Sequence, residues 1–190
     1  MILPDPNPTV ALALAEDVGG GDLTALPPHV ADLAEFSLAT GLRLANAAGL
    51  RWDQIDLGRR TAWIHADQNK SKKDLVVPLN DSAAEVLRRC WGQHPEVVFT
   101  YLGHPIKRPD ILTWRRACQK AGIADFRWHD LRHTWASWHV QAGTSLQTLM
   151  ELGGWSSYEM VLRYAHLAGE HLHSAAANVV TIRLRGGKSA

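Results

Sequence analysis

The sequence predicts a mostly helical α+β fold that carries one small antiparallel sheet. Patterns with the helix period dominate its 190 residues, and the clearest runs from Trp128 to Gln141, with Gly143 beyond its end. The pattern changes to that of β-strands at 61–66 and at 74–79, which the polar, basic segment 68–73 joins. Two such strands with a short polar connection predict a β-hairpin, and most of the remaining elements are expected to be helices.

Start and stop signals place the elements in order. Pro27-Pro28 opens the first helix, and Asn80-Asp81-Ser82 offers N-caps for a later one that runs through Cys90. The expected helices run from 28 toward 41, then over 44–50, 80–90, 110–120, 128–141 and 144–153, followed by one that Ser156-Ser157 cap and that carries Tyr164, and by 170–179; a short extended run is expected at 97–100.

Length and composition limit the class of protein. A chain of 190 residues with 46% hydrophobic residues is long enough for one substantial core. Cys90 and Cys118 are widely spaced and match neither a disulfide framework nor a metal site, so we expect a reducing compartment. No apolar run approaches the roughly 18 residues of a membrane span, and the N-terminus lacks the basic flank of a signal peptide. A cytoplasmic protein with no membrane contact is therefore expected.

Charge is distributed unevenly along the chain. Residues 1–42 hold six acidic residues and no Lys or Arg, so all 20 basic residues and the other 13 acidic ones lie after them. That later part has a net charge of +7, although the whole chain has only +1. A body of that charge is compatible with a polyanionic partner.

The chain divides into three segments of different character. Residues 1–26 begin with a proline-rich run and include Gly19-Gly20-Gly21, and the stretch 13–25 resembles the start of bacterial quinolinate phosphoribosyltransferases, without any of that family's phosphate-binding or catalytic residues. We therefore expect 1–26 to be a poorly ordered leader or fusion scar. Residues 27–180 are expected to form one folded domain, and 181–190 a basic tail.

The stretch from 128 to 138 carries the densest set of chemically useful side chains. On a helix, His129 and Arg132 project from one face, which pairs a proton-handling group with a fixed cation and suits a phosphate. His133 lies four residues after His129, which is also zinc-ligand spacing. A zinc-protease helix has Glu directly after the first His, however, whereas this chain has Asp130 and lacks a third ligand at a standard offset. We therefore favour a phosphate site over a metal site.

Five sequence boxes, in order, carry a resemblance to a known family. They are Thr40-Gly41-Leu42-Arg43; Asn69-Lys70-Ser71 with Val77-Pro78-Leu79; His129-Asp130-Leu131-Arg132-His133-Thr134; Leu152-Gly153-Gly154-Trp155-Ser156-Ser157; and Arg163-Tyr164-Ala165-His166. Together they resemble the catalytic domain of tyrosine recombinases of the phage integrase type. The resemblance covers about residues 28–180, so it implies that the folded domain has the integrase-type catalytic fold.

The resemblance implies DNA strand transfer through a covalent intermediate. Tyr164 is then the nucleophile, which stays attached to phosphorus as a 3′-phosphotyrosine so that the ester can be re-formed with another 5′-hydroxyl. Arg43 and Arg132 are expected to hold the non-bridging oxygens and to offset the charge of the transition state. His129 adds a donor and a possible base. Tyr158 is the alternative nucleophile.

Two further residues complete the expected site. Lys70 on the hairpin turn would protonate the leaving 5′-oxygen, because the pKa of a lysine falls readily when it is desolvated beside other cations. Lys72 and Lys73 are alternatives for this role. Trp155 stands where the family usually has His, and its indole N–H can donate to a phosphate oxygen although it cannot relay protons. Asn46 stands where many members have Glu.

We therefore expect a site-specific DNA recombinase that binds double-stranded DNA and needs no metal, ATP or other cofactor. The apolar stripe of 170–179 predicts a helix that is buried either on its own core or on a neighbouring protomer, and the second choice predicts self-association on DNA. Family members generally carry a DNA-clamping domain before the catalytic one, for which the residues before 27 are too few. The alternatives are a catalytically inactive DNA-binding remnant of an integrase and, from another class, a zinc hydrolase that uses His129 and His133.

Overall fold

In a computed structural model of the chain, the structure describes residues 26–106, 111–120, 123 and 125–168, and helices make up most of them, as predicted. The α-helices are α2 (Pro28–Thr40), α3 (Leu44–Ala48), α4 (Asp81–Cys90), α5 (Ile111–Lys120), α6 (Trp128–Gln141), α7 (Leu146–Gly153) and α8 (Glu159–Leu162); η2 (Trp52–Gln54) and η3 (Ala165–Ala168) are 3₁₀-helices. The strands are β1 (Ile55–Asp56), β2 (Thr61–Ile64), β3 (Leu75–Pro78), β4 (Thr100–Tyr101) and β5 (His104–Pro105).

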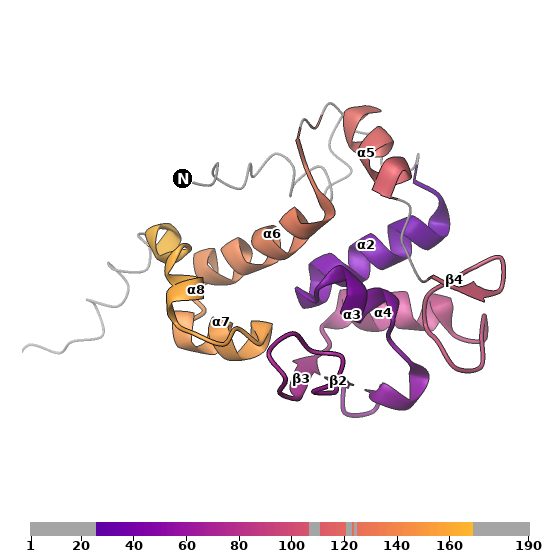
Figure 1. Cartoon of the computed structure of the whole chain (residues 1–190), viewed down its shortest axis with the longest axis horizontal. Helices are drawn as coiled ribbons and strands as arrows, with labels where there is room; N and C mark the ends of the chain where they lie inside the picture. Colours follow the sequence, from indigo (N-terminus) through magenta and orange to yellow (C-terminus); the bar gives the residue numbers. More distant parts are fainter. Residues whose placement is uncertain (1–25, 107–110, 121–122, 124, 169–190) are drawn as a thin grey trace, which may run out of the picture.

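Helix α2 is the element on which the larger part of the fold packs. Its buried residues include Leu33 and Phe36, and α3, α4 and α6 all contact it. Figure 1 shows α3 and α4 beside it. The helix ends at Gly41, whose φ of 65° is left-handed and whose N–H donates to the carbonyl of Ser37. Because of this sharp end, the chain turns directly into Arg43 at the N-cap of α3.

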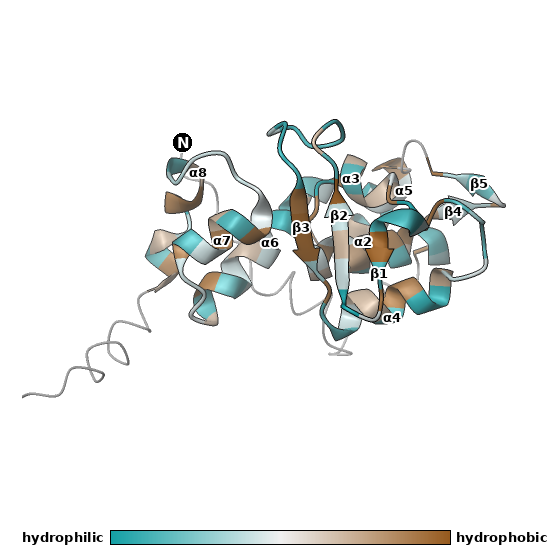
Figure 2. Ribbon diagram, turned by 90° about the horizontal axis from the view of Figure 1, so that it is seen from below, coloured by the Kyte–Doolittle hydropathy of each residue, from teal (hydrophilic) through white to brown (hydrophobic). Residues whose placement is uncertain are grey.

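The predicted hairpin is confirmed, and it belongs to a three-stranded antiparallel sheet in the order β1-β2-β3. Strands β2 and β3 pair Ala62 with Val77 and Ile64 with Leu75, and all four side chains are buried. The segment between the two strands continues beyond their ends as a hydrophilic loop (Figure 2). Strand β1 pairs through only two residue pairs, and so short a strand gives no alternating pattern from which to predict it.

Helix α4 begins as its capping sequence predicts. The Oδ1 atom of Asn80 accepts the backbone N–H of Ala83 at 2.9 Å. Near the other end of the helix, Arg89 pairs with Asp32 and Glu35 of α2, which fixes α4 against the central helix. The extended run predicted at 97–100 ends in β4, and its pairing with β5 is a second hairpin that the sequence does not reveal.

Buried apolar side chains form two clusters, and α6 contributes to both. The larger cluster gathers residues of α2, α4, α5 and the main sheet, and it includes Trp128 and Leu131 of α6. The smaller cluster joins Trp135 of α6 to side chains of α7 and α8 and to Tyr164. The bounds predicted for α6 are confirmed. Arg132 therefore lies on α6 between the residues of the two clusters.

The helix expected to carry Tyr164 is shorter than predicted. Helix α8 has Tyr158 rather than a serine at its N-cap, and it ends before Tyr164. The N–H of Tyr164 donates to the carbonyl of Val161 at 3.0 Å, and the N–H of Leu167 donates to the carbonyl of Tyr164 at 3.0 Å. This i to i+3 winding places Val161 and Tyr164 one above the other, and both are buried, so packing against the smaller cluster accounts for the tighter turn.

Some expectations concern segments that the structure does not describe. The predicted helix at 170–179, the leader and the basic tail lie outside the described residues. Within the described part of the chain, every helix is too short or too polar to cross a membrane.

Candidate active site

The first two turns of α6 present the ionisable side chains on which the sequence analysis centred. Asp130 fixes the start of the helix, because its Oδ2 accepts the backbone N–H of Arg127 at 2.7 Å. His129, Arg132 and His133 follow at spacings of three and four residues, which bring them to neighbouring positions. Arg132 is only 4% exposed, whereas His129 is exposed and His133 is partly buried.

The guanidinium of Arg132 joins the C-terminal ends of two helices. Nη1 donates to the carbonyl of Gly41 after α2, and Nη2 donates to the carbonyl of Gly153 in α7, each at 2.6 Å. Carbonyl groups at helix ends lack intrahelical partners, so these bonds satisfy them. A guanidinium has five N–H groups, and the two that are used leave three for a ligand. Among the described residues no carboxylate pairs with Arg132.

Two tryptophans pack directly on the glycines that hold Arg132. A Cβ atom would lie 2.3 Å from the ring of Trp135 at Gly41 and 2.0 Å from the ring of Trp155 at Gly153, so neither position has room for a side chain. The Cζ atom of Arg132 is 4.1 Å from the centroid of Trp155, which is a cation–π contact. In the described part of the chain, the indole N–H of Trp155 has no hydrogen-bond partner and is available to a ligand oxygen.

Arg43 is the second cation of the site. It is partly buried, and its Nη1 donates to Oδ1 of Asn69 at 3.2 Å. Burial lowers the pKa of Arg43, and burial followed by the charge of Arg43 lowers the pKa of Arg132 to about 10. The two guanidiniums therefore lie close enough to repel one another. An anion placed between them would relieve that repulsion and would accept hydrogen bonds from both.

Tyr164 is buried beside Trp155 and Arg132. Its ring centroid is 6.1 Å from that of Trp155, and its hydroxyl oxygen lies 2.6 Å from Nδ1 of His133. Burial raises the pKa of Tyr164, and the charges of two nearby arginines lower it to a smaller extent, so the phenol is neutral at pH 7. Tyr158, the alternative nucleophile, is 46% exposed at the start of α8.

The turn of the hairpin reaches Arg43 through the side chain of one asparagine. Asn69 is 2% exposed, accepts from Arg43, and donates through Nδ2 to the carbonyl of Lys73 at 2.8 Å. Lys70, Lys72 and Lys73 all have exposed side chains. The structure therefore brings the turn to the site, but it does not bring the ammonium of Lys70 into contact with the other predicted site residues.

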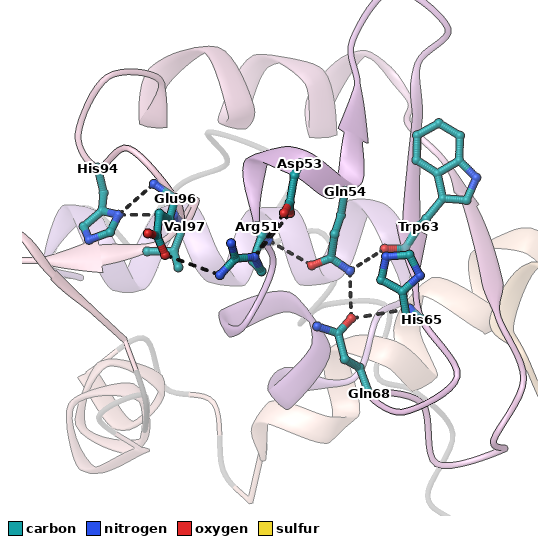
Figure 3. A network of polar contacts seen from close by, with 9 residues as sticks. All are labelled: Arg51, Asp53, Gln54, Trp63, His65, Gln68, His94, Glu96 and Val97. Atoms are coloured by element: carbon teal, nitrogen blue, oxygen red, sulfur yellow. Dashed lines mark hydrogen bonds and ion pairs between the residues drawn. The ribbon is translucent and has the colours of Figure 1, made fainter.

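A buried glutamine anchors the base of this turn. Gln54 is 3% exposed, and its Nε2 donates to the carbonyl of Trp63 and to Oε1 of Gln68, each at 2.7 Å. Its Oε1 accepts the backbone N–H of Arg51 at 3.1 Å, so every polar atom of the amide has a partner (Figure 3). Asn46 also donates to the carbonyl of Gln68, at 3.4 Å, so this residue supports the hairpin turn.

His133 is the site residue that sequence reasoning does not identify. The sequence offers it only as the second histidine of a pair with zinc-ligand spacing, whereas its Nδ1 in fact contacts the hydroxyl of Tyr164, 31 residues later. Its ring meets that of His129 edge-on at 4.9 Å. The described residues contain no group of three or more His, Cys, Asp or Glu side chains that could hold a metal ion. The position of His133 directly after Arg132 is the only local signal, because a partner so far along the chain cannot be read from spacing.

The predicted residues thus fall into three sets. Arg132, Trp155 and Tyr164 are adjacent, and Arg43 is within electrostatic range of Arg132 and of His129. Partial desolvation, followed by the charge of Arg132, lowers the pKa of His129, and the carboxylate of Asp130 opposes this shift. The hairpin lysine stands apart from both sets. Two cations, an indole N–H and a phenol in one place can bind an anion such as a phosphodiester and attack it.

A family model and known proteins match most of this sequence. A model of the phage integrase family matches residues 24–171. The chain is 48% identical over 163 residues to the integrase of Salmonella phage P22, an alignment that covers 79% of this chain and 42% of that protein. It is 32% identical over 167 residues to the tyrosine recombinase XerD of Lacticaseibacillus casei, covering 78% of this chain and 55% of that one. The chain therefore spans about half the length of these relatives.

Solved structures share the fold. The catalytic domain of bacteriophage HP1 integrase matches with a TM-score of 0.64 at 25% identity, and the match covers 90% of this chain and 92% of that one. The Tn1549 transposon integrase in complex with transposon right end DNA matches with a TM-score of 0.68, covering 90% of this chain and 65% of that one. The second pair is 17% identical, so it shows a common fold alone. The integrase-type fold predicted from the sequence is thus confirmed.

Proposed function

We propose, from the premise that this chain belongs to the phage integrase family, that it carries out site-specific DNA recombination. The reaction is the cleavage and rejoining of double-stranded DNA through a 3′-phosphotyrosine on Tyr164. The observation that carries this assignment is a buried tyrosine beside a buried arginine that has no carboxylate partner among the described residues. In this proposal residues 27–180 form the catalytic domain.

The scissile phosphate would bind between the two arginines. Arg132 has three N–H groups that the protein does not use, and it is held in place by two carbonyls and by the face of Trp155. Arg43 approaches from the start of α3, and the indole N–H of Trp155 can donate to an oxygen of the phosphate. Donors that are fixed before the reaction stabilise developing negative charge most effectively, and one such donor is typically worth about 10²–10³ in rate.

The chemical step is an exchange of phosphate esters. The oxygen of Tyr164 attacks phosphorus, and the bond from phosphorus to the 5′-oxygen breaks, so the energy of the ester is kept in the protein–DNA bond. His129, at the exposed edge of the site, supplies a further donor to the phosphate. Because guanidinium groups supply the positive charge, the proposed step uses no metal ion and no nucleotide cofactor.

Lys70 is the proposed acid that protonates the leaving 5′-oxygen. Its support is indirect: the neighbouring Asn69 is hydrogen-bonded to Arg43, so the turn and the phosphate site share one anchor. The ammonium is exposed in this state and would be desolvated only when DNA covers the turn. Lys72 and Lys73, on the same turn, are the alternatives.

Partners follow from the same proposal. The substrate is double-stranded DNA, so we place the protein in the cytoplasm, and we propose self-association on DNA through the segment 170–179, whose apolar stripe is a property of the sequence. Deleting residues 169–190 tests this part. A loss of DNA-dependent assembly with an unchanged melting temperature would support docking on a neighbouring protomer, whereas a large drop in melting temperature would mean that the segment packs on its own domain.

The test of the proposed function is covalent capture on DNA. The chain is incubated with a pool of duplexes that have a randomised central segment and a nick from which the short 5′-hydroxyl fragment diffuses away, and adducts are recovered after denaturation. We expect Tyr164→Phe to abolish the adduct and to leave DNA affinity within a few fold, and Tyr158→Phe to retain the adduct. DNA binding without any adduct from the unmodified chain would instead support the inactive DNA-binding remnant.

A further inference from the structure

The nucleophilic oxygen of the proposed reaction already has a partner in this structure. The hydroxyl of Tyr164 lies 2.6 Å from Nδ1 of His133, which is a short hydrogen bond. It joins the turn just before η3 to the second turn of α6. Both residues belong to the same chain, and Tyr164 is only 5% exposed. The tyrosine therefore lies in the site formed by its own chain.

Both members of this pair are neutral. Burial raises the pKa of Tyr164, and burial lowers the pKa of His133 to about 4, so both groups are neutral at pH 7. When His133 carries its own proton on Nε2, the lone pair of its Nδ1 accepts the hydrogen of the Tyr164 hydroxyl. A transfer of the phenol proton to Nδ1 requires this tautomer.

We propose that His133 is a catalytic residue that orients Tyr164 and accepts its proton as the phosphotyrosine forms. This rests on the proposed function. In the cleavage step the O–H bond of Tyr164 breaks as the oxygen bonds to phosphorus, the proton moves to Nδ1 of His133, and the 5′-oxygen leaves with a proton from Lys70. In the rejoining step the 5′-hydroxyl attacks phosphorus and gives its proton back to the neutral amine of Lys70, the bond from Tyr164 to phosphorus breaks, and the imidazolium returns its proton to the phenol oxygen.

Geometry favours His133 over His129 for this step. His129 is exposed, and its described aromatic contact is with the ring of His133 rather than with Tyr164. In the described part of the chain, the hydroxyl of Tyr164 has His133 as its hydrogen-bond partner and no other. A base has to lie within hydrogen-bond distance of the proton that it takes, and His133 meets that requirement.

The charged surroundings of His133 link its basicity to the substrate. The groups that face it are His129, Asp130 and Arg132 on α6, and Arg163 and Tyr164 on the segment after α8. Apart from Asp130 and the neutral phenol, these groups disfavour a positive charge on His133. A phosphodiester bound to Arg132 would offset that effect and make His133 a stronger base only once DNA is in place. The free protein would keep its nucleophile protonated.

The hydrogen bond and the tautomer can be measured without DNA. In protein labelled with ¹⁵N at histidine, we expect His133 at neutral pH to carry its proton on Nε2, and its Nδ1 signal to shift in Tyr164→Phe. The signal is assigned by its loss in His133→Asn. A proton on Nδ1, or an Nδ1 signal that is the same in Tyr164→Phe, would overturn the proposal, because His133 could not then accept from the phenol.

Single-turnover adduct formation tests the proton transfer. The probe is a duplex recovered from the randomised pool, made with either oxygen or sulfur at the 5′-bridging position, so that the sulfur form needs no acid. We expect His133→Ala to be slower by about 10²–10⁴ on both forms. His133→Asn should be nearly as slow, because its amide oxygen can accept the hydrogen bond but cannot take the proton. A near-normal rate in His133→Asn would reduce the role to orientation and overturn the proton transfer.

A matched control lies two turns further along the same helix. His139 is also partly buried on α6 and uses its Nδ1 in a hydrogen bond, with Oγ1 of Thr144 at 3.1 Å. His139→Asn should leave the rate within a few fold of the unmodified chain, and an equal loss in both variants would mean that the effect is one of packing. If the unmodified chain forms no adduct, the proposed function fails, and the ¹⁵N result still decides whether His133 accepts from Tyr164.

Discussion

Replacing Arg132 by glutamine should remove activity while leaving the fold nearly as stable as before. The reason is that Arg132 is a buried cation without a carboxylate partner among the described residues, so in the proposed reaction its charge would stabilise a bound phosphate. Glutamine removes the charge but retains an NH₂ group that can donate to one of the two carbonyls, those of Gly41 and Gly153. Retaining one donor makes it a milder change than alanine, which would leave a cavity as well.

Two opposing contributions set the expected change in stability. The pKa of Arg132 is lowered to about 10, which corresponds to a penalty of about 3 kcal/mol on the charged form at every pH well below 10. Losing one of its two charge-assisted hydrogen bonds costs about 1.5–3 kcal/mol. These nearly cancel, so the free energy of unfolding should change by less than about 1.5 kcal/mol. The rate of adduct formation should fall at least about 100-fold.

Denaturant unfolding followed by tryptophan fluorescence measures the first quantity, and single-turnover adduct formation measures the second. Arg88→Gln is the matched control, because Arg88 is 59% exposed on α4 and should change neither. A loss of more than about 3 kcal/mol in Arg132→Gln would show that the arginine is a structural clamp between α2 and α7. Adduct formation at a near-normal rate would remove Arg132 from the catalytic site.

Three further predictions concern Lys70, Gly153 and His133. Cleavage by Lys70→Ala should be restored on DNA with sulfur at the 5′-bridging position, because a thiolate leaves without a proton, whereas Lys72→Ala should need no such rescue; equal slowing on oxygen and sulfur would make Lys70 a phosphate contact. Gly153→Ala should lower the free energy of unfolding by about 1–3 kcal/mol and slow adduct formation, since the added methyl group would lie 2.0 Å from the ring of Trp155; unchanged stability in a denaturant titration would contradict that packing. Because the pKa of His133 is lowered to about 4 from an ordinary value of about 6.5, its contribution to stability is complete above pH 6.5 and is lost as the pH falls toward 4. The melting temperature of His133→Asn should therefore fall less steeply over that range, and parallel curves would count against a buried neutral His133.

The fold could be predicted where its signals are local. Helix α6 was placed correctly because its period, its aromatic residues and the glycine after its end all lie within one stretch. The hairpin of β2 and β3 was placed for the same reason. Strands β1, β4 and β5 have two residues each, so they carry no period, and they exist only because neighbouring strands pair with them.

The site could be predicted as a set of residue types but not as a set of contacts. The partners of Arg132 lie 91 and 21 residues away in the sequence, and they are backbone carbonyls, which no side-chain pattern reveals. The break in the helix before Tyr164 follows from packing of Val161 and Tyr164 against α6 and α7. The capping signal of Ser156-Ser157 predicts where a helix begins, but it contains no information about this packing and therefore predicts too long a helix. His133 was missed because its partner belongs to another element.

The most direct test of the account is to locate the covalent bond. The chain is trapped on a nicked duplex from the randomised pool, the complex is digested with protease and nuclease, and the peptide that carries a nucleotide is identified by mass spectrometry. We expect the nucleotide on Tyr164, joined through a 3′-phosphate. A nucleotide on Tyr158, or on any residue other than a tyrosine, would contradict the assignment of Tyr164 as the nucleophile.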